Sequence, residues 1–307
     1  MNTAVFVGAV LAAQTLTAPP GRMIDVGGRR LHLHCTGAGS PAVILVAGGG
    51  AFAIDWALVQ PPLAATTRVC SYDRAGLGWS DVGPADETVE QTVADLHELL
   101  QRAGERPPYV LVGASIGGIF IRAYQRAFPS DVAALVFSNS ANRVGLAANG
   151  VNGLLWTLSE SQIRSAFPLP PPPGPAPSRE DDPFDRLPAD LQASRLQFDV
   201  QLYERFQRQR DDSASLLSWR KEFLREFDET ESGTPPLGAL PVVIISSDPI
   251  LADSTRSRDG LAARRPLFSS NTTAVVAKGS GHEIHLYQPE TVVETIRRAL
   301  AALPDRK

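Results

Sequence analysis

The sequence predicts an α/β fold in which helices cover both faces of a mostly parallel sheet. Two observations support this. Short runs rich in Val, Ile and Leu alternate with stretches of helical periodicity, and several of these runs are continuously apolar, as strands buried on both faces are. The chain of 307 residues is long enough to bury a large core. Its 43% hydrophobic and 20% charged residues are typical of a soluble globular protein.

The strands are expected at short apolar runs, and the crossovers that join parallel neighbours are expected to be right-handed. The first two runs are joined by a link of only a few residues, 37–41, so these early strands can pair antiparallel. The expected strands are Arg30–Cys35, Ala42–Val46, Thr67–Tyr72, Tyr109–Val112, Val132–Phe137, Val242–Ile245 and Thr272–Val276.

Helices are expected between these strands. The segment Thr88–Gln91 has the form of a capping box, and the helix that it opens has apolar residues on one face. A second helix is expected over 116–128, directly after a strand. A third begins near Pro289 and has the apolar face Val292, Val293, Ile296, Ala299 and Leu300.

The middle of the chain interrupts this alternation. Strands are missing from 141–237, and the nearly all-proline segment 168–177 favours a polyproline-II spacer over a recognition motif for a proline-binding domain. Apolar residues then recur at helical spacing, beginning with Leu196 and Val200. We therefore expect a helical cap at 141–237, inserted into a core formed by 21–140 and 238–307.

The first 20 residues contain a short apolar run, Ala4 to Ala13, that resembles the apolar part of a signal peptide but lacks a preceding Lys or Arg. The run is too short to span a membrane as a helix. It slightly favours export, to a periplasm or outside the cell, over a cytoplasmic location.

The two cysteines, Cys35 and Cys70, lack metal-binding or C-x-x-C spacing, so they are either unpaired buried thiols or a disulfide.

Ser115 is the candidate nucleophile. It lies in Gly113–Gly117, a G-x-S-x-G pattern between an apolar run and a helix-like stretch. A sharp strand-to-helix turn at a serine exposes its hydroxyl and leaves the next N–H, that of Ile116, facing a developing oxyanion. The pattern alone is weak in a chain with 25 glycines, and an ordinary glycine-rich turn is the alternative. The flanking strand and helix favour the catalytic interpretation.

A base and an acid complete the expected triad. Among five histidines, His282 fits best because it follows the last strand in a glycine-rich loop that can reach over the sheet edge, and His285 is the fallback. Asp248, at the end of the strand before it, is the expected acid, and Asp253 is its rival. The other acid position, after Val132–Phe137, has no carboxylate.

The oxyanion hole is expected to combine the N–H of Ile116 with one from the glycine loop after the Ala42–Val46 run. Gly49 is the first candidate and Gly50 the second. A phosphate site is the alternative for three consecutive glycines. However, the loop has neither a following Gly-Lys-Ser/Thr nor a G-x-G-x-x-G frame.

With these residues placed, the chain resembles α/β-hydrolase-fold serine hydrolases of the AB hydrolase-1-like group, which carry a cap between core strands six and seven. The most specific segments are Ser71–Asp81, the Ser115 turn, and Ser280–His282 followed by Pro289 and Glu290. The resemblance covers about residues 21–303, apart from the cap. It implies the α/β-hydrolase fold and a structural role for the residues at positions 73 and 74.

The resemblance has further implications. It makes the strands of Cys35 and Cys70 neighbours, so a disulfide is possible in an exported protein. Ala47 and Ala114 stand where relatives often have histidine, which bears on substrate preference. A serine at the elbow argues against the epoxide hydrolase and haloalkane dehalogenase members, which use aspartate there.

The function expected from these residues is hydrolysis of a carboxylic ester of a small or medium apolar substrate through an acyl-enzyme. The alternatives are an amide, peptide or carbon–carbon bond hydrolase with the same triad, and a binding protein with a slow or silent triad. No cofactor or metal is expected. The net charge of −4 offers no basic face for nucleic acid or anionic lipid, so a small molecule is the expected partner, and the oligomeric state stays open.

Overall fold

The computed structural model describes residues 18–83, 88–140, 183–208, 217–218, 221–222, 237–247 and 269–303. The apolar N-terminal run, the proline-rich segment 168–177 and both candidate acids, Asp248 and Asp253, lie outside these residues. Within them, no helix has the length and apolar composition that a membrane crossing needs.

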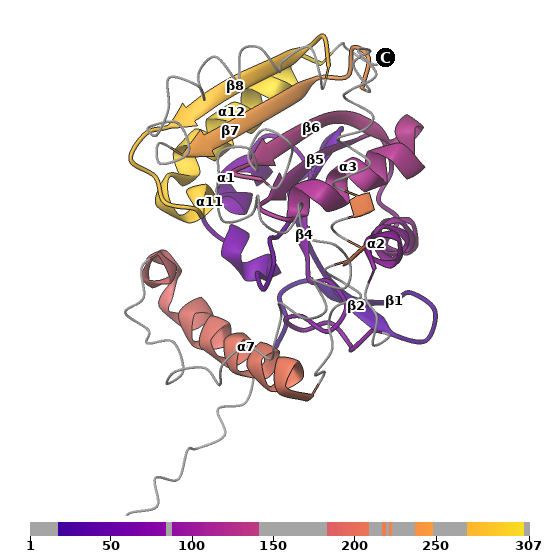
Figure 1. The fold of residues 1–307 in the computed structure, drawn as a ribbon, viewed down its shortest axis with the longest axis vertical. Coiled ribbons are helices and arrows are strands. Elements are labelled where there is room, and N and C mark those ends of the chain that lie inside the picture. The colour runs from indigo at the N-terminus through magenta and orange to yellow at the C-terminus, as the bar shows by residue number, and fades with distance from the viewer. Residues whose placement is uncertain are drawn as a thin grey trace, which may run out of the picture.

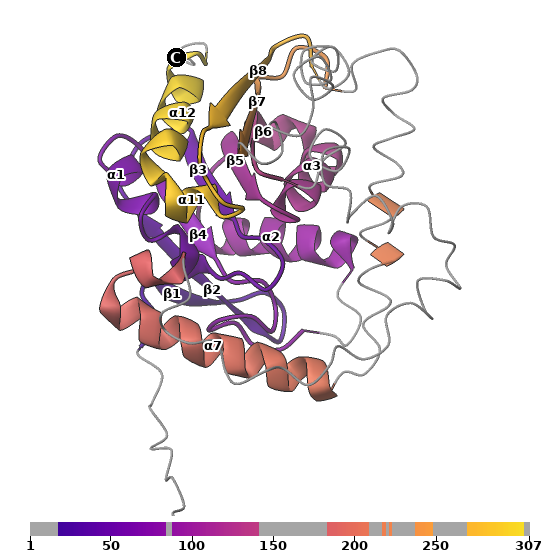
Figure 2. The same ribbon diagram turned by 60° about the vertical axis from the view of Figure 1, so that its left-hand side comes forward.

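The described core is one twisted sheet with helices on both faces (Figures 1 and 2). Its strand order is β1-β2-β4-β3-β5-β6-β7-β8, and every neighbouring pair from β4 to β8 is parallel. The strands are β1 (Arg22–Asp25), β2 (Arg30–Thr36), β3 (Ala42–Val46), β4 (Val69–Tyr72), β5 (Tyr109–Ala114), β6 (Val132–Ser138), β7 (Val242–Ser247) and β8 (Thr272–Ala277).

The central strands β3, β5 and β6 are buried along their whole length, as their unbroken apolar sequences predict. One apolar cluster packs α2 and α3 on one face of the sheet, and a second packs α1 and α12 on the other. The described helices are α1 (Gln60–Ala64), α2 (Val89–Ala103), α3 (Gly117–Ala127), α7 (Ala189–Arg208), α11 (Ile284–Tyr287) and α12 (Pro289–Ala301), with 3-10 turns η1 (Ala53–Trp56), η2 (Pro129–Asp131) and η3 (Phe184–Arg186).

The expected antiparallel pairing of the first two predicted strands, β2 and β3, across the short link 37–41 is not found. Instead, β2 lies between β1 and β4 and is antiparallel to both. The reason is that β3 pairs in parallel with β4 on one side and β5 on the other, so neither of its edges is left for β2.

The capping box at Thr88–Gln91 is only half formed. Thr88 Oγ1 accepts from Gln91 N–H at 3.1 Å, while the Gln91 side chain donates to Asp95.

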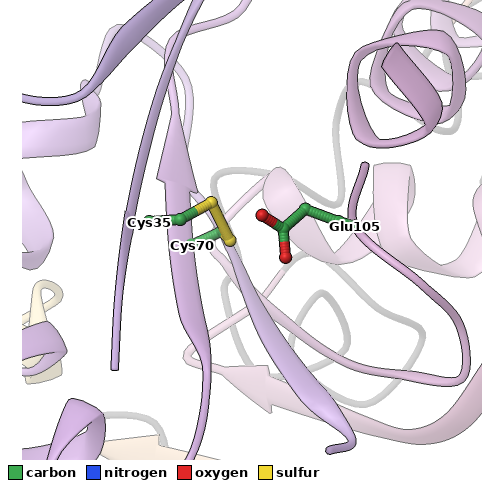
Figure 3. A group of neighbouring side chains, drawn as sticks. All are labelled: Cys35, Cys70 and Glu105. Atoms are coloured by element: carbon green, nitrogen blue, oxygen red, sulfur yellow. A yellow bond between two sulfur atoms is a disulfide. The ribbon is translucent and has the colours of Figure 1, made fainter. Parts of the chain in front are cut away.

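The β2–β4 pairing brings the two cysteines together. Cys35 and Cys70 are directly opposite residues, with Cα atoms 4.0 Å apart, and they form a disulfide (Figure 3). Glu105 lies beside the bridge, but its carboxylate binds the Arg68 guanidinium. Because both sulfurs are in the disulfide, neither is a thiolate that could bind a metal ion with Glu105. This settles the alternative between free thiols and a bridge.

The segment predicted to form the cap contributes η3 and α7. Helix α7 lies along the end of the molecule beside β1 and β2 (Figure 2). Phe198 of α7 is 1% exposed and contacts the rings of Phe52 and Trp79, with centroids 5.1 and 4.8 Å away. Arg195 of the same helix forms a buried ion pair with Asp55 of η1 at 2.9 Å. Helix α7 is therefore fixed to the segment that follows the glycine loop.

Candidate active site

Ser115 stands on a strained turn between β5 and α3. Its φ is +50°, a left-handed conformation that is rare for residues other than glycine. The end of β6 holds this backbone from both sides, since Ser115 N–H donates to Ser138 O at 3.1 Å and Ser140 Oγ donates to Ser115 O at 2.6 Å. The strain is thus fixed by the neighbouring strand, and Ser115 is half-buried rather than enclosed.

The two glycines of the motif are required by close backbone packing. A Cβ at Gly113 would lie 2.6 Å from the backbone of Gly117, and a Cβ at Gly117 would lie 2.5 Å from Val46 O. The next residue, Gly118, leaves room for the hydroxyl of Ser140. These contacts draw the start of α3 against the end of β3, where the glycine loop begins.

The glycine loop lies directly beside the nucleophile. A Cβ on Gly48 would be 3.1 Å from Ser115 Cβ and 3.8 Å from its Oγ, and one on Gly49 would contact the Ile116 side chain at 3.5 Å. Within the described residues, the N–H groups of Gly49 and Ile116 have no hydrogen-bond acceptor. The structure therefore brings the two predicted oxyanion donors to the same end of the sheet as Ser115.

His282 is held at this end by Asn139, which follows β6. Asn139 Nδ2 donates to His282 O at 3.0 Å, lies 3.2 Å from His282 Nδ1, and contacts Ser247 Oγ at 3.3 Å. Ser115 and His282 thus contact adjacent residues of one short segment, 138–140. His282 is exposed, and no hydrogen bond joins it to Ser115 Oγ in the part of the chain that the structure describes. Such bonds are often loose before substrate binds.

The described residues end one position before the candidate acid, Asp248. Strand β7 ends at Ser247, and Asp248 is the next residue. Because Ser247 Oγ contacts the Asn139 amide that binds the histidine loop, β7 ends beside that loop. The sequence did not single out Asn139 as a functional residue. In the sequence, its position stood out only as the other acid position, where a carboxylate is lacking. An asparagine at this strand end tolerates a left-handed φ, here +42°.

His285, the fallback base, is a core residue. It is 5% exposed and packs against Trp56 of η1, with ring centroids 4.5 Å apart and ring planes tilted by 32°. Burial lowers the pKa of His285 to about 3, so the ring is neutral at ordinary pH. This contact fixes the histidine segment to η1, which follows the glycine loop. A catalytic base is expected in an open loop after the last strand, whereas His285 lies inside helix α11.

An apolar wall adjoins the glycine loop. Phe52, Ile54 and Leu77 form a buried cluster with Phe198 of α7, and a Cβ on Gly50 would lie 3.1 Å from Leu202 of the same helix. Arg195 lies over the Phe52 ring and forms an ion pair with Asp55. Burial raises the pKa of Asp55 to about 6. Burial also raises the pKa of Glu283, next to His282, while His282 and Arg195 oppose that rise.

Sheet order, the serine turn and the loop after β8 together define an α/β-hydrolase fold. The chain belongs to the alpha/beta hydrolase family, whose model matches residues 43–295. Solved structures agree on the fold: a thermophilic esterase from Thermogutta terrifontis has a TM-score of 0.61 at 22% identity over 94% of this chain and 96% of that one. A Vigna radiata epoxide hydrolase mutant has a TM-score of 0.63 at 19% identity over 91% and 98%.

Among curated proteins, the chain is similar to a 2-hydroxy-6-oxo-2,4-heptadienoate hydrolase from Pseudomonas putida, at 36% identity over 143 residues, which are 45% of this chain and 50% of that protein. A 2-hydroxymuconate semialdehyde hydrolase from a Pseudomonas species is 36% identical over 124 residues, or 39% of this chain and 44% of that protein. The chain spans half or less of the length of such curated relatives.

Proposed function

We propose that this protein is a serine hydrolase that cleaves a carboxylic ester of a small or medium apolar substrate. The observation that carries the proposal is the strained turn at Ser115, with φ +50°, beside two N–H groups that lack an acceptor in the described residues. Backbone strain of this kind persists where the surrounding structure imposes it, and it is concentrated at functional sites.

In the proposed reaction, His282 removes the proton from Ser115 Oγ, which attacks the ester carbonyl carbon. The N–H groups of Gly49 and Ile116 hold the tetrahedral oxyanion, the alcohol leaves with a proton from His282, and an acyl-enzyme remains. Water, deprotonated by His282, then releases the acid and restores Ser115. Asp248 is proposed to orient His282 and stabilise its charged form.

The apolar wall supports an apolar substrate. Phe52, Leu77 and Phe198 form a buried apolar cluster, and the half-buried Leu202 packs against it beside Gly50, so an acyl or alcohol group bound at Leu202 would lose water-exposed apolar surface, which favours binding. We further propose that 141–237 forms the cap over this site, because its described helix α7 already provides Phe198 and Leu202. The Cys35–Cys70 disulfide supports an exported protein, since disulfides persist in oxidising compartments.

A carbon–carbon bond hydrolase with the same triad is the second candidate. It is favoured by the 36% identity to two proteins named as hydrolases of 2-hydroxy-6-oxo-2,4-heptadienoate and of 2-hydroxymuconate semialdehyde. The two candidates share the nucleophile, so they are separated by substrate. p-Nitrophenyl esters of increasing chain length, amides and a 2-hydroxy-6-oxo-dienoate are the compounds to compare.

The experiment that tests the nucleophile is labelling with a fluorophosphonate. We expect the native protein to be labelled and to hydrolyse the esters, and Ser115→Ala to lose both properties.

The acid is tested by Asp248→Asn, which should lower kcat by about 10⁴-fold as loss of a triad aspartate does, with Asp253→Asn as the matched control. Absence of labelling in the native protein contradicts both enzyme hypotheses and favours a binding protein. Equal losses in the two aspartate variants contradict the choice of Asp248.

A further inference from the structure

The dipeptide Asp73-Arg74, directly after β4, is a buried pair of charged residues that contacts the glycine loop. Arg74 is 6% exposed and Asp73 1% exposed. Arg74 Nη1 donates to Ala47 O at 2.7 Å, and its Nη2 donates to Gly48 O at 2.8 Å. The guanidinium also lies over the Phe120 ring of α3, 5.0 Å from its centroid. One side chain therefore binds two consecutive carbonyls of the loop.

These two hydrogen bonds, together with the bond from Ala51 N–H to Gly48 O at 3.3 Å, fix which way the loop's N–H groups point. In a planar trans peptide, the carbonyl of one residue and the N–H of the next point in opposite directions. With the carbonyls of Ala47 and Gly48 turned toward Arg74, the N–H groups of Gly48 and Gly49 are turned away from it. Reversing the 48–49 peptide would put the Gly48 carbonyl where the Gly49 N–H stands and leave a buried guanidinium donor without its acceptor.

Asp73 fixes the other end of the same loop. Its Oδ1 accepts from Ala53 N–H at 2.7 Å, and its Oδ2 lies 2.8 Å from Nδ1 of the buried His32. A Cβ on Gly78 would lie 2.4 Å from the Asp73 carboxylate, so the carboxylate is closely surrounded. The loop from Ala47 to Ala53 is thus held at both ends by adjacent residues of one turn.

No carboxylate forms a direct ion pair with Arg74 in the described parts of the chain. Its side-chain contacts there are two carbonyls and an aromatic ring. A buried cation without a paired anion is costly to the fold. The same charge stabilises negative charge that develops nearby in a site of low dielectric.

We propose that Arg74 is a positioning residue of the oxyanion hole: it turns the 47–49 peptides so that the Gly49 N–H faces the substrate oxygen, and it places a buried positive charge behind them. This proposal rests on the proposed function, in which the oxyanion is held by Gly49 and Ile116. It assigns to Arg74 a role in the transition state in addition to a role in stability.

The test uses Arg74→Ala, Arg74→Lys and, as a matched control, Arg122→Ala, which removes another buried arginine, 3% exposed, on α3. Removing one oxyanion donor lowers kcat by about 100- to 1000-fold, and we expect Arg74→Ala to lose about 100-fold in kcat with KM changed by less than about threefold. Arg74→Lys keeps the charge but not the two-pronged geometry, so its loss should be intermediate. Added guanidinium at millimolar concentration should restore part of the Arg74→Ala activity and none to Arg122→Ala.

Two further measurements separate positioning from folding. The endpoint of fluorophosphonate labelling counts competent Ser115, and it should stay near one per chain in Arg74→Ala while the labelling rate falls with kcat. A crystal structure of Arg74→Ala should show the Gly48 carbonyl turned from its original direction. A variant that retains both the carbonyl direction and a kcat equal to that of Arg122→Ala overturns the proposal. If the native protein neither labels nor hydrolyses, the proposed function fails, and the crystal structure alone decides whether Arg74 orients the loop.

Discussion

The nucleophile side and the histidine side of the candidate site are fixed by different means. Ser115 and the glycine loop are held by backbone packing, in which Gly113 and Gly117 leave no room for a Cβ, and by a buried arginine. His282 is exposed and depends on the side chain of Asn139, with further support from the contact between the Trp56 and His285 rings one turn away.

This difference predicts different responses to substitution. On the nucleophile side, an added methyl group meets backbone atoms that cannot move independently, so fold and activity should be lost together. On the histidine side, a lost side-chain hydrogen bond leaves the backbone in place, so activity should fall with little loss of stability. The predictions below test this contrast, beginning with the largest effect.

Gly117→Ala should be the most damaging of these changes. Its Cβ would lie 2.5 Å from Val46 O, so the elbow or β3 must shift. We expect the free energy of unfolding to fall by about 3 kcal/mol, the upper range for overpacking, together with loss of ester hydrolysis. Urea unfolding and kinetic assays check this.

Gly104→Ala is the control for Gly117→Ala. Gly104 has a φ of +81° but open space around its Cβ position, so it should lose only about 1 kcal/mol and keep its activity. Gly117 has no left-handed φ, so backbone contact is its expected source of lost stability, and equal destabilisation in the two variants would contradict that steric explanation.

Acid should weaken the histidine side through His285. The native pKa of about 3 is below its ordinary value of 6.5, so between pH 6.5 and 3 the unfolded chain binds a proton that the folded chain does not. Stability is therefore complete above pH 6.5 and falls as the pH drops toward 3. From pH 7.5 to pH 5 the loss from this group should be about 2 kcal/mol.

His285→Phe should remove that loss, because it keeps a ring against Trp56 but cannot take up a proton. The measurement is urea unfolding of both proteins at pH 7.5 and pH 5. The native protein should lose about 2 kcal/mol more than the variant over this interval. The same pH dependence in both proteins would mean that His285 does not control it.

Asn139→Gly should separate activity from stability. It removes the amide that binds His282 but suits the left-handed φ of +42° at this position. We expect kcat to fall about tenfold, equivalent to about 1.4 kcal/mol, with a nearly unchanged urea midpoint. Asn139→Ala should lose the same activity and also lose stability, because alanine is strained there. An unchanged kcat in both variants would exclude Asn139 from holding the histidine.

Local signals explain what the sequence predicted well. The run before Ser115 and the helix after it are adjacent in the chain, and the structure has β5, the turn and α3 at those residues. The strand Ala42–Val46 matches β3 residue for residue. In contrast, the short strand β1, with exposed ends, and the four-residue helix α11 carry too few residues for a periodic pattern.

Contacts between distant segments were not predictable in the same way. The pairing of Cys35 with Cys70 depends on which edge of β4 is free. Residue types left a disulfide as one of two alternatives, and the resemblance alone suggested that the two strands are neighbours. Arg74 reaches back 26 residues to Gly48, and Asn139 reaches forward 143 residues to His282. No spacing rule connects such positions, because only the folded sheet brings these strand ends to one edge.

The steric demands on Gly113 and Gly117 have a consequence for how related sequences are classified. A Cβ at either position meets backbone atoms whatever residue stands between them. A descendant that lost the serine hydroxyl, and with it catalysis, would still need both glycines to fold. The pair therefore marks ancestry and architecture, while activity must be assigned from the residue at position 115 and from the peptide direction at Gly48. Surveys that count the glycine pattern as proof of catalysis would include inactive members of the family.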